Sequence, residues 1–106
     1  QVFTQAVQKG VAIVFSTDAN SGWVWSGDTA IEFDRRVAGG QSTKDAIVSA
    51  TSRAAEALQI ADIGNLVSGY RADVIAVEGD PLVDINALRR LLLVMKDGEI
   101  YRSPER

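Results

Sequence analysis

The sequence contains neither cysteine nor histidine. The absence of cysteine excludes disulfides and thiolate metal sites, and it fits a cytoplasmic protein. The absence of histidine matters more, because histidine is the commonest transition-metal ligand and the usual general base near neutral pH. A catalytic metal site normally needs about three protein ligands. Any such site here would use carboxylates alone or ligands from another chain, so we expect no metal bound to the isolated chain.

Long apolar runs and dense positive charge are also missing. No apolar stretch reaches the length of a membrane span, and no basic segment followed by an apolar one marks a signal peptide. The 106 residues carry a net charge of −3, so neither a membrane nor a nucleic acid is expected as a partner. The chain is long enough for one domain with a modest core. It begins with Gln1 rather than Met, as a processed product or a piece of a longer protein would.

The most informative stretch present is the apolar run VAIVFS at residues 11–16, which ends in Thr17 and Asp18. A β-branched run that stops at a small polar cluster is typical of a buried parallel strand whose C-terminal end opens into a site. Active-site residues of α/β folds lie at this position. Asp18 is therefore the leading catalytic candidate. The alternative is that its carboxylate only bonds to neighbouring backbone amides in a turn.

The rest of the chain predicts an α/β fold in two parts that meet near Gln59. Residues 1–58 are expected to hold helices at 2–9, 29–38 and 42–58, with Asp28 and Ser42 as N-caps. Residues 59–106 are expected to hold strands at 65–67, 73–77, 91–96 and 99–102. Asp97 and Gly98 predict a two-residue hairpin between the last two strands.

Other residues that carry charge or aromatic rings have two interpretations each. Trp23 and Trp25 share a face if the loop around them is extended, so they either line a substrate pocket or pack on the core or a subunit interface. Four charged residues on the helix at 29–38 are expected to form a solvated face with weak ion pairs: Glu32, Asp34, Arg35 and Arg36. Three carboxylates of the second part are expected to serve turns and caps: Asp73, Asp80 and Asp84.

Six segments of the chain carry a family resemblance when they are taken together. They are GVAIVFSTDA (10–19), STKDAI (42–47), ATSRAAEAL (50–58), IGNLVSGYRADVI (63–75), GDPLVDI (79–85) and VMKDG (94–98). In this order they resemble the G-V-x-I-x-x-G-T-D-A, T-P-x-E-A-L, A-T-x-x-x-A-x-x-L, I-G-x-L-x-x-G-x-x-A-D-L-V, G-D-P-L-x-D-I and V-x-x-G segments of the metal-dependent amidohydrolase superfamily. The imidazolonepropionase-like and Xaa-Pro dipeptidase-like branch is the most similar.

The resemblance implies a (β/α)8 barrel joined to a small β-sandwich, of which this chain matches about the C-terminal quarter. Residues 1–58 would supply the last barrel strand and its outer helices, and residues 59–106 would supply sandwich strands with the C-terminal hairpin. Asp18 occupies the position of the aspartate that binds a divalent metal, zinc in many members, and takes the proton of the attacking water. The substrate implied is a small molecule or peptide with a C–N bond.

The family's histidine ligands have no counterpart in this chain, which leaves two hypotheses. In the first, the chain is a C-terminal part of an amidohydrolase and is inactive by itself. In the second, it is a non-catalytic α/β module for assembly or oligomerisation. An uncovered quarter of a barrel exposes strand and helix faces, so we expect either a homo-oligomer or a missing N-terminal portion.

Overall fold

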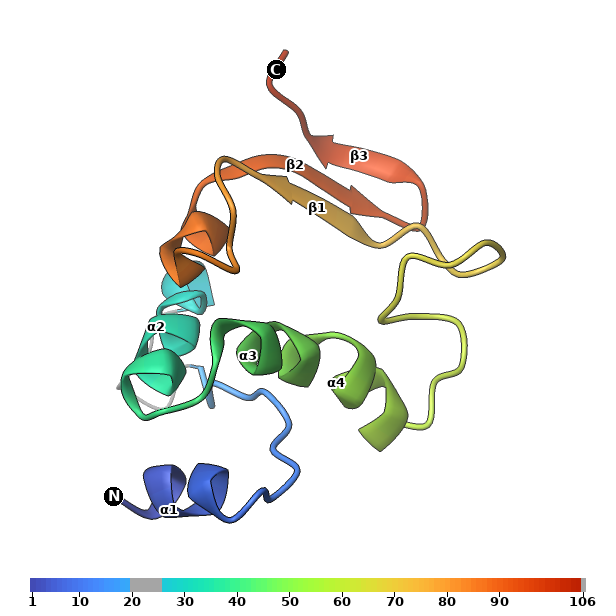
Figure 1. Cartoon of the computed structure of the whole chain (residues 1–106). Helices are drawn as coiled ribbons and strands as arrows, with labels where there is room; N and C mark the ends of the chain where they lie inside the picture. The colour runs from blue at the N-terminus through green and yellow to red at the C-terminus, as the bar shows by residue number, and fades with distance from the viewer. Residues whose placement is uncertain (20–25, 106) are drawn as a thin grey trace.

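The computed structural model describes residues 1–19 and 26–105. Helices fill the first part of the described chain and an antiparallel sheet lies in the second (Figure 1). The elements are α1 (Val2–Gln8), η1 (Ser26–Asp28), α2 (Ile31–Ala38), α3 (Thr43–Ala50), α4 (Ser52–Ala57), β1 (Val74–Val77), η2 (Ile85–Arg89), β2 (Leu91–Lys96) and β3 (Glu99–Arg102). The predicted mixture of helices and an antiparallel sheet is confirmed.

The helix expected at residues 42–58 begins as predicted but is interrupted at Thr51. The hydroxyl of Ser42 accepts a hydrogen bond from the Asp45 amide at 3.0 Å, which caps α3. Thr51 has φ −122° and ψ −97°, outside the helical region, and its hydroxyl donates to the Ile47 carbonyl. Such back-bonding by threonine bends helices. The expectation of one continuous helix was therefore wrong.

The sheet has the order β1-β2-β3, with both pairs antiparallel. Asp97 and Gly98 form the turn between β2 and β3 with φ values of 50° and 82°. Two positive φ angles are what a two-residue hairpin of this twist requires, so the prediction is confirmed. Asp84 caps η2 by accepting a hydrogen bond from the Asn86 amide at 3.0 Å.

Two further local predictions were wrong. Residues 65–67 form no strand, and the side chain of Leu66 is 84% exposed. Asp28 does not cap α2, whose first residue is Ile31 and whose N-cap makes no side-chain hydrogen bond. The Asp28 carboxylate instead pairs with Arg89 of η2, at 3.0 Å. This long-range ion pair connects η1, which precedes α2, to η2, which precedes β2.

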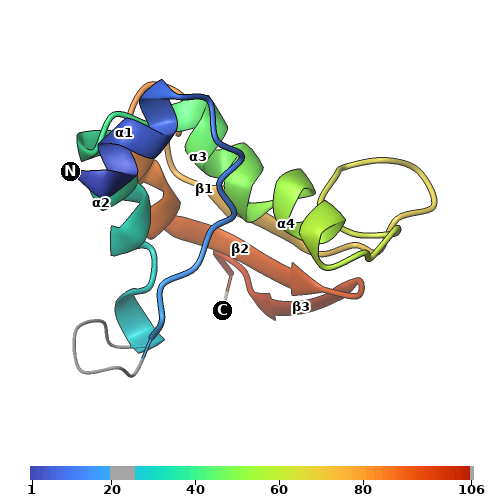
Figure 2. The ribbon, with the colours of Figure 1, turned by 90° about the horizontal axis from the view of Figure 1, so that it is seen from below.

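The apolar run at residues 11–16 does not form a strand among the described residues. It leaves α1 and passes beside the helices as a single segment (Figure 2). Val11 is 55% exposed and Val14 is 39% exposed, so the prediction of a buried strand was wrong for the chain in this structure. A strand exists only when a neighbouring strand completes its backbone hydrogen bonds. Helices, not strands, lie next to this segment in the part of the chain that the structure describes.

The hydrophobic core is small. Its buried apolar side chains in the described chain are Ala46, Ala55, Ile85 and Ala87. The total accessible surface is 7429 Å², whereas a folded monomer of this mass exposes about 5,800 Å². Among the described residues, no helix combines the length and apolarity needed to cross a bilayer. The chain therefore exposes more surface than a self-contained domain of its size.

Candidate active site

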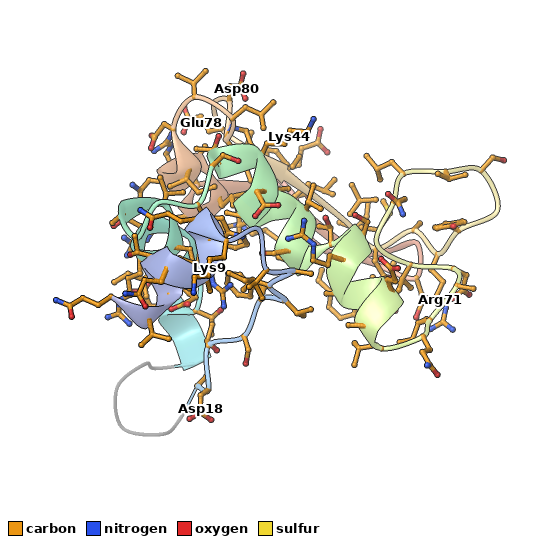
Figure 3. The ribbon with its side chains drawn as sticks, turned by 60° about the horizontal axis from the view of Figure 1, so that its bottom comes forward. Lys9, Asp18, Lys44, Arg71, Glu78 and Asp80 are labelled. Atoms are coloured by element: carbon orange, nitrogen blue, oxygen red, sulfur yellow. The ribbon has the colours of Figure 1, made fainter. Side chains whose placement is uncertain are left out.

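Asp18 lies at the end of the segment formed by residues 11–18, and its side chain is exposed. Figure 3 shows it at the edge of the molecule, far from Lys44, Glu78 and Asp80. Its φ of 49° falls in the left-handed region, which is unfavourable for most side chains but accessible to aspartate. The backbone therefore presents this carboxylate outward from a conformation that the surrounding contacts must hold.

Three hydrogen bonds fasten the backbone of the 11–18 segment to α2, α3 and α4. The Phe15 amide donates to the Ser49 carbonyl of α3 at 3.0 Å. The Arg53 guanidinium of α4 donates through Nη1 to the Ile13 carbonyl at 3.2 Å. The Arg36 guanidinium of α2 donates through Nη2 to the Ser16 carbonyl, also at 3.2 Å. Two arginine side chains thus supply hydrogen bonds that the amides of a neighbouring strand would supply in a sheet.

Arg36 is the most buried charged residue of this region, with only 7% of its surface exposed. Its Nε donates to Glu32 Oε1 at 2.9 Å, and its guanidinium lies 4.8 Å from the centre of the Phe15 ring and 5.6 Å from that of Phe3. The Phe15 ring also stacks on Phe33, with 4.3 Å between ring centroids. A cation over aromatic faces is stabilised by the ring quadrupoles.

The burial of Arg36 corrects the prediction of a solvated charged face on α2. Asp34 and Arg35 are exposed as expected, but Arg36 turns inward. The Glu32–Arg36 spacing of four residues is equally common in exposed helical pairs. Nothing in that spacing signals that this pair lies under the segment that ends in Asp18.

Arg53 is oriented by a second polar network. Asp45 accepts from Arg53 Nη2 at 2.7 Å and from Gln41 Nε2 at 2.6 Å. The hydrogen bond from Arg53, followed by that from Gln41, lowers the pKa of Asp45 below its ordinary value of 3.8. The same hydrogen bond raises the pKa of Arg53. Asp45 is therefore ionised at neutral pH and holds Arg53 where it reaches the Ile13 carbonyl.

The described residues do not form a metal centre by themselves. Within residues 1–19 and 26–105, no group of three aspartates or glutamates comes together. Asp80 and Asp84 accept hydrogen bonds from the nearby amides of Leu82 and Asn86, and Asp73 accepts one from the amide of Asp97, 24 residues away in the hairpin turn. All three carboxylates thus serve turns or caps, as the sequence predicted. A single carboxylate at Asp18 does not fit a resident metal on its own. The other predicted site residues, Trp23 and Trp25, lie outside the described residues.

The chain has an α/β fold, and its candidate site is one exposed carboxylate at the end of an apolar segment. Comparison with known proteins identifies the class of protein: the model of the Amidohydrolase family matches residues 1–101, and the chain belongs to this family. The family resemblance of the six sequence segments is thereby confirmed.

The chain is similar to several individual members of known function or structure. Ochratoxinase of Aspergillus niger is 34% identical over 98% of this chain and 22% of its own length, and its crystal structure superimposes with a TM-score of 0.81. A crystal structure of a Xaa-Pro dipeptidase with methionine in its active site is 42% identical, with a TM-score of 0.90 over 96% of this chain and 25% of that one. Molinate hydrolase is 26% identical, with a TM-score of 0.84 over 92% of this chain and 25% of that one. The chain therefore spans about a quarter of the length of these relatives.

Proposed function

We propose that this chain is the C-terminal quarter of a metal-dependent amidohydrolase that hydrolyses a C–N bond in an amide, a peptide or a cyclic amide. The observation that carries the proposal is the family match over residues 1–101, which includes Asp18 at the end of the 11–18 segment. The exposed position of that carboxylate supports a role toward a ligand rather than in the core. A Xaa-Pro dipeptide is the first substrate to test, because the Xaa-Pro dipeptidase structure combines 42% identity with a TM-score of 0.90.

The architecture proposed for the complete protein follows the same division as the sequence. Residues 1–58 would be the terminal segment of a (β/α)8 barrel, in which residues 11–16 become the last strand once a neighbour pairs with them. Residues 59–106 would contribute strands β1, β2 and β3 to a β-sandwich. The excess exposed surface supports this division, because a barrel strand and a sheet face both need covering.

The chemistry proposed for Asp18 is proton transfer. Its carboxylate would accept a proton from the water that attacks the scissile carbonyl and would deliver it to the leaving amine. Asp18 would also be one ligand of a divalent metal, with zinc tested first, whose remaining ligands would come from outside the described residues. The contribution that this chain makes by itself is an exposed carboxylate at the end of a segment whose backbone bonds to α2, α3 and α4.

The decisive experiment uses the full-length protein. We expect its upstream sequence to contain an H-x-H motif and the purified protein to hydrolyse a Xaa-Pro dipeptide or a related amide. Asp18→Asn should lower kcat/KM by about 10²- to 10⁴-fold, the range typical of a lost general base. Glu78→Gln is the matched control, because Glu78 is an exposed carboxylate at the opposite end of the view in Figure 3 and should leave the rate unchanged.

Two results would contradict the proposal. Full activity of the Asp18→Asn enzyme would remove Asp18 from the mechanism. Zinc binding by the 106-residue chain with micromolar or tighter affinity, abolished by Asp18→Asn, would show that this chain builds a site without the rest of the protein.

A second candidate function is assembly without catalysis, and the many exposed apolar side chains favour it. In that case the chain would cover its exposed faces with further copies of itself. An upstream sequence without metal-binding histidines, together with a stable oligomer of the 106-residue chain in size-exclusion chromatography, would favour this candidate. A stable monomer would count against it.

A further inference from the structure

We propose that Arg36 is a positioning residue that sets the location of the Asp18 carboxylate by holding the Ser16 carbonyl. The inference rests on the proposed function, because it assigns Arg36 a role toward the catalytic carboxylate. It goes beyond that function by naming a residue of α2, outside the segment that carries Asp18, for which the sequence pattern predicted only a solvated position.

The first argument is the free-energy cost of burying the Arg36 guanidinium. A guanidinium that is only 7% exposed has lost most of its hydration, and removing a charge from water is unfavourable unless partners replace the water. Glu32 supplies one charged partner at 2.9 Å. Nη1 of Arg36 nevertheless stays buried without a hydrogen-bond partner among the described residues. An apolar side chain of similar volume would fill this space at less cost, so stability alone does not explain an arginine here.

The second argument is what the guanidinium touches. Its Nη2 reaches the carbonyl of Ser16, two residues before Asp18. Its Cζ atom lies 4.8 Å from the centre of the Phe15 ring, so the same group contacts both the backbone and the neighbouring side chain of the segment. Glu32 and the aromatic rings in turn fix the guanidinium. The result is a chain of contacts from the rigid helix α2 to the peptide that leads into Asp18.

The third argument is the conformation of Asp18. A φ of 49° is less favourable for aspartate than an extended or right-handed helical angle. If the peptide at Ser16 were released, the segment would relax toward those angles and the carboxylate would move. A displacement of about 1 Å at a catalytic group can cost about 10²-fold in rate. By holding the Ser16 carbonyl, Arg36 would therefore keep the Asp18 carboxylate in the position that the reaction needs.

Arg53 provides an internal comparison. It also donates to a carbonyl of the segment, but at Ile13, five residues before Asp18. Loss of the Arg53 contact should loosen the start of the segment while Arg36 still holds its end. The effect on catalysis should therefore fall with distance from Asp18, and Arg36 should matter more than Arg53.

The test measures kcat and KM of variants of the full-length enzyme on the substrate established for the wild type. Arg36→Met and Arg36→Lys should lower kcat by about 10- to 100-fold while KM stays within about twofold, because a buried residue behind the segment does not touch substrate. Lysine keeps the charge, but it cannot bond through one group to Glu32 and through another to Ser16. Arg53→Met should lower kcat about threefold, as a weaker effect on positioning. Arg35→Met, at the exposed neighbouring position on α2, is the matched control and should change nothing.

A second measurement separates positioning from simple loss of stability. In Arg36→Ala, guanidinium at low millimolar concentration should restore part of kcat, whereas sodium chloride at the same ionic strength should not. A folded Arg36→Lys enzyme with wild-type kcat would overturn the inference, as would a drop confined to KM. If Asp18→Asn itself retained activity, the proposed function would fail. If Asp18→Asn were inactive and Arg36→Lys fully active, only the role of Arg36 would fail.

Discussion

Residues 74–102 and residues 11–18 both contain apolar runs, yet only the first region completes its own backbone hydrogen bonds among the described residues. In the sheet, β2 pairs with β1 on one side and with β3 on the other. The 11–18 segment instead relies on Ser49, Arg36 and Arg53 for the contacts that fix its backbone. The first region contains its partners within 30 residues of sequence, whereas the second is held by two arginine side chains and a backbone carbonyl of the helices.

The difference shows that strand propensity and strand formation are separate properties. A run of β-branched and aromatic residues fits a pleated, half-buried surface, but the surface must be provided by a neighbour. In β1 to β3 a connection that contains η2 and a two-residue turn bring the neighbouring strands into place. For residues 11–16 the missing neighbour would come from the rest of an amidohydrolase barrel, under the proposed function.

The largest expected effect of this difference is on amide hydrogen exchange. In the 106-residue chain, the amides of Ile13 and Val14 should exchange at least about 100-fold faster than that of Leu93 in β2, because exchange follows the free energy of local opening. The Phe15 amide, which donates to Ser49, is the internal control and should be slower than its neighbours. In the full-length protein the amides of the segment should become as protected as those of β2.

Equal protection from hydrogen exchange for the 11–18 segment and for β2 in the 106-residue chain would contradict the difference between the two regions. It would mean that the helices alone stabilise residues 11–18 as well as a sheet does. Fast exchange of the segment in the full-length protein would instead remove the argument that these residues become a barrel strand.

The features that the sequence predicted correctly are those whose partners lie a few residues away. The Asp97–Gly98 turn, the Ser42 cap and the Asp84 cap each depend on one to four consecutive residues. The break at Thr51 was missed because the sequence pattern does not show whether the threonine hydroxyl bonds back to the Ile47 carbonyl, as it does at 2.8 Å. A periodic alanine face contains no information about that contact.

In the candidate site, too, local patterns can be read from the sequence and contacts between distant residues cannot. Asp18 was selected as a candidate because a carboxylate directly after an apolar run is a local pattern, and its role as ligand and proton acceptor stays a prediction from the family resemblance. Arg36 was not selected from the sequence, because the role proposed for it depends on a contact 20 residues away in sequence, at Ser16. Charged residues on a helix are usually solvated, so no pattern within α2 distinguishes Arg36 from the exposed Arg35.

A smaller effect is expected at Gly64, where the loop before the sheet packs against the helices. Gly64 and Gly69 have nearly the same φ, 86° and 90°, but an added Cβ would meet Thr51 and Ala55 at Gly64 and nothing within 4 Å at Gly69. Gly69→Ala should therefore cost about 1 kcal/mol of stability from backbone strain alone. Gly64→Ala should cost about 2–4 kcal/mol, because overpacking adds to the strain.

Urea unfolding of the two variants measures the difference, and Gly69→Ala serves as the control for φ. Equal losses at the two positions would mean that the contact between the loop and the break at Thr51 is loose. The helical layer and the sheet would then be joined mainly by other contacts, such as the Asp28–Arg89 pair.

The smallest expected effect concerns Asp45. Its carboxylate orients Arg53, and Arg53 gives the Ile13 carbonyl a hydrogen bond that a neighbouring strand would give it in a sheet. The pKa of Asp45 is lower in the folded chain than its ordinary value of 3.8, mainly because of the hydrogen bond from Arg53. A lowered folded pKa means that the stabilisation is fully present above about pH 4 and is lost as the pH falls through the folded value. The Asp45 side chain is 42% exposed, so solvent screening limits the contribution to about 0.5–1 kcal/mol.

Asp45→Asn should therefore lower the free energy of unfolding by about that amount at pH 7 and by progressively less below pH 4, where the wild-type carboxylate also becomes neutral. Urea unfolding at pH 7, 4 and 2.5 measures this trend. In an Arg53→Met background the pH-dependent difference should shrink, because the largest cause of the lowered pKa is gone. A difference that persists at pH 2.5 would show that Asp45 acts through packing rather than charge, and the segment before Asp18 would then owe its position to Arg36 and Ser49 more than to the Asp45–Arg53 pair.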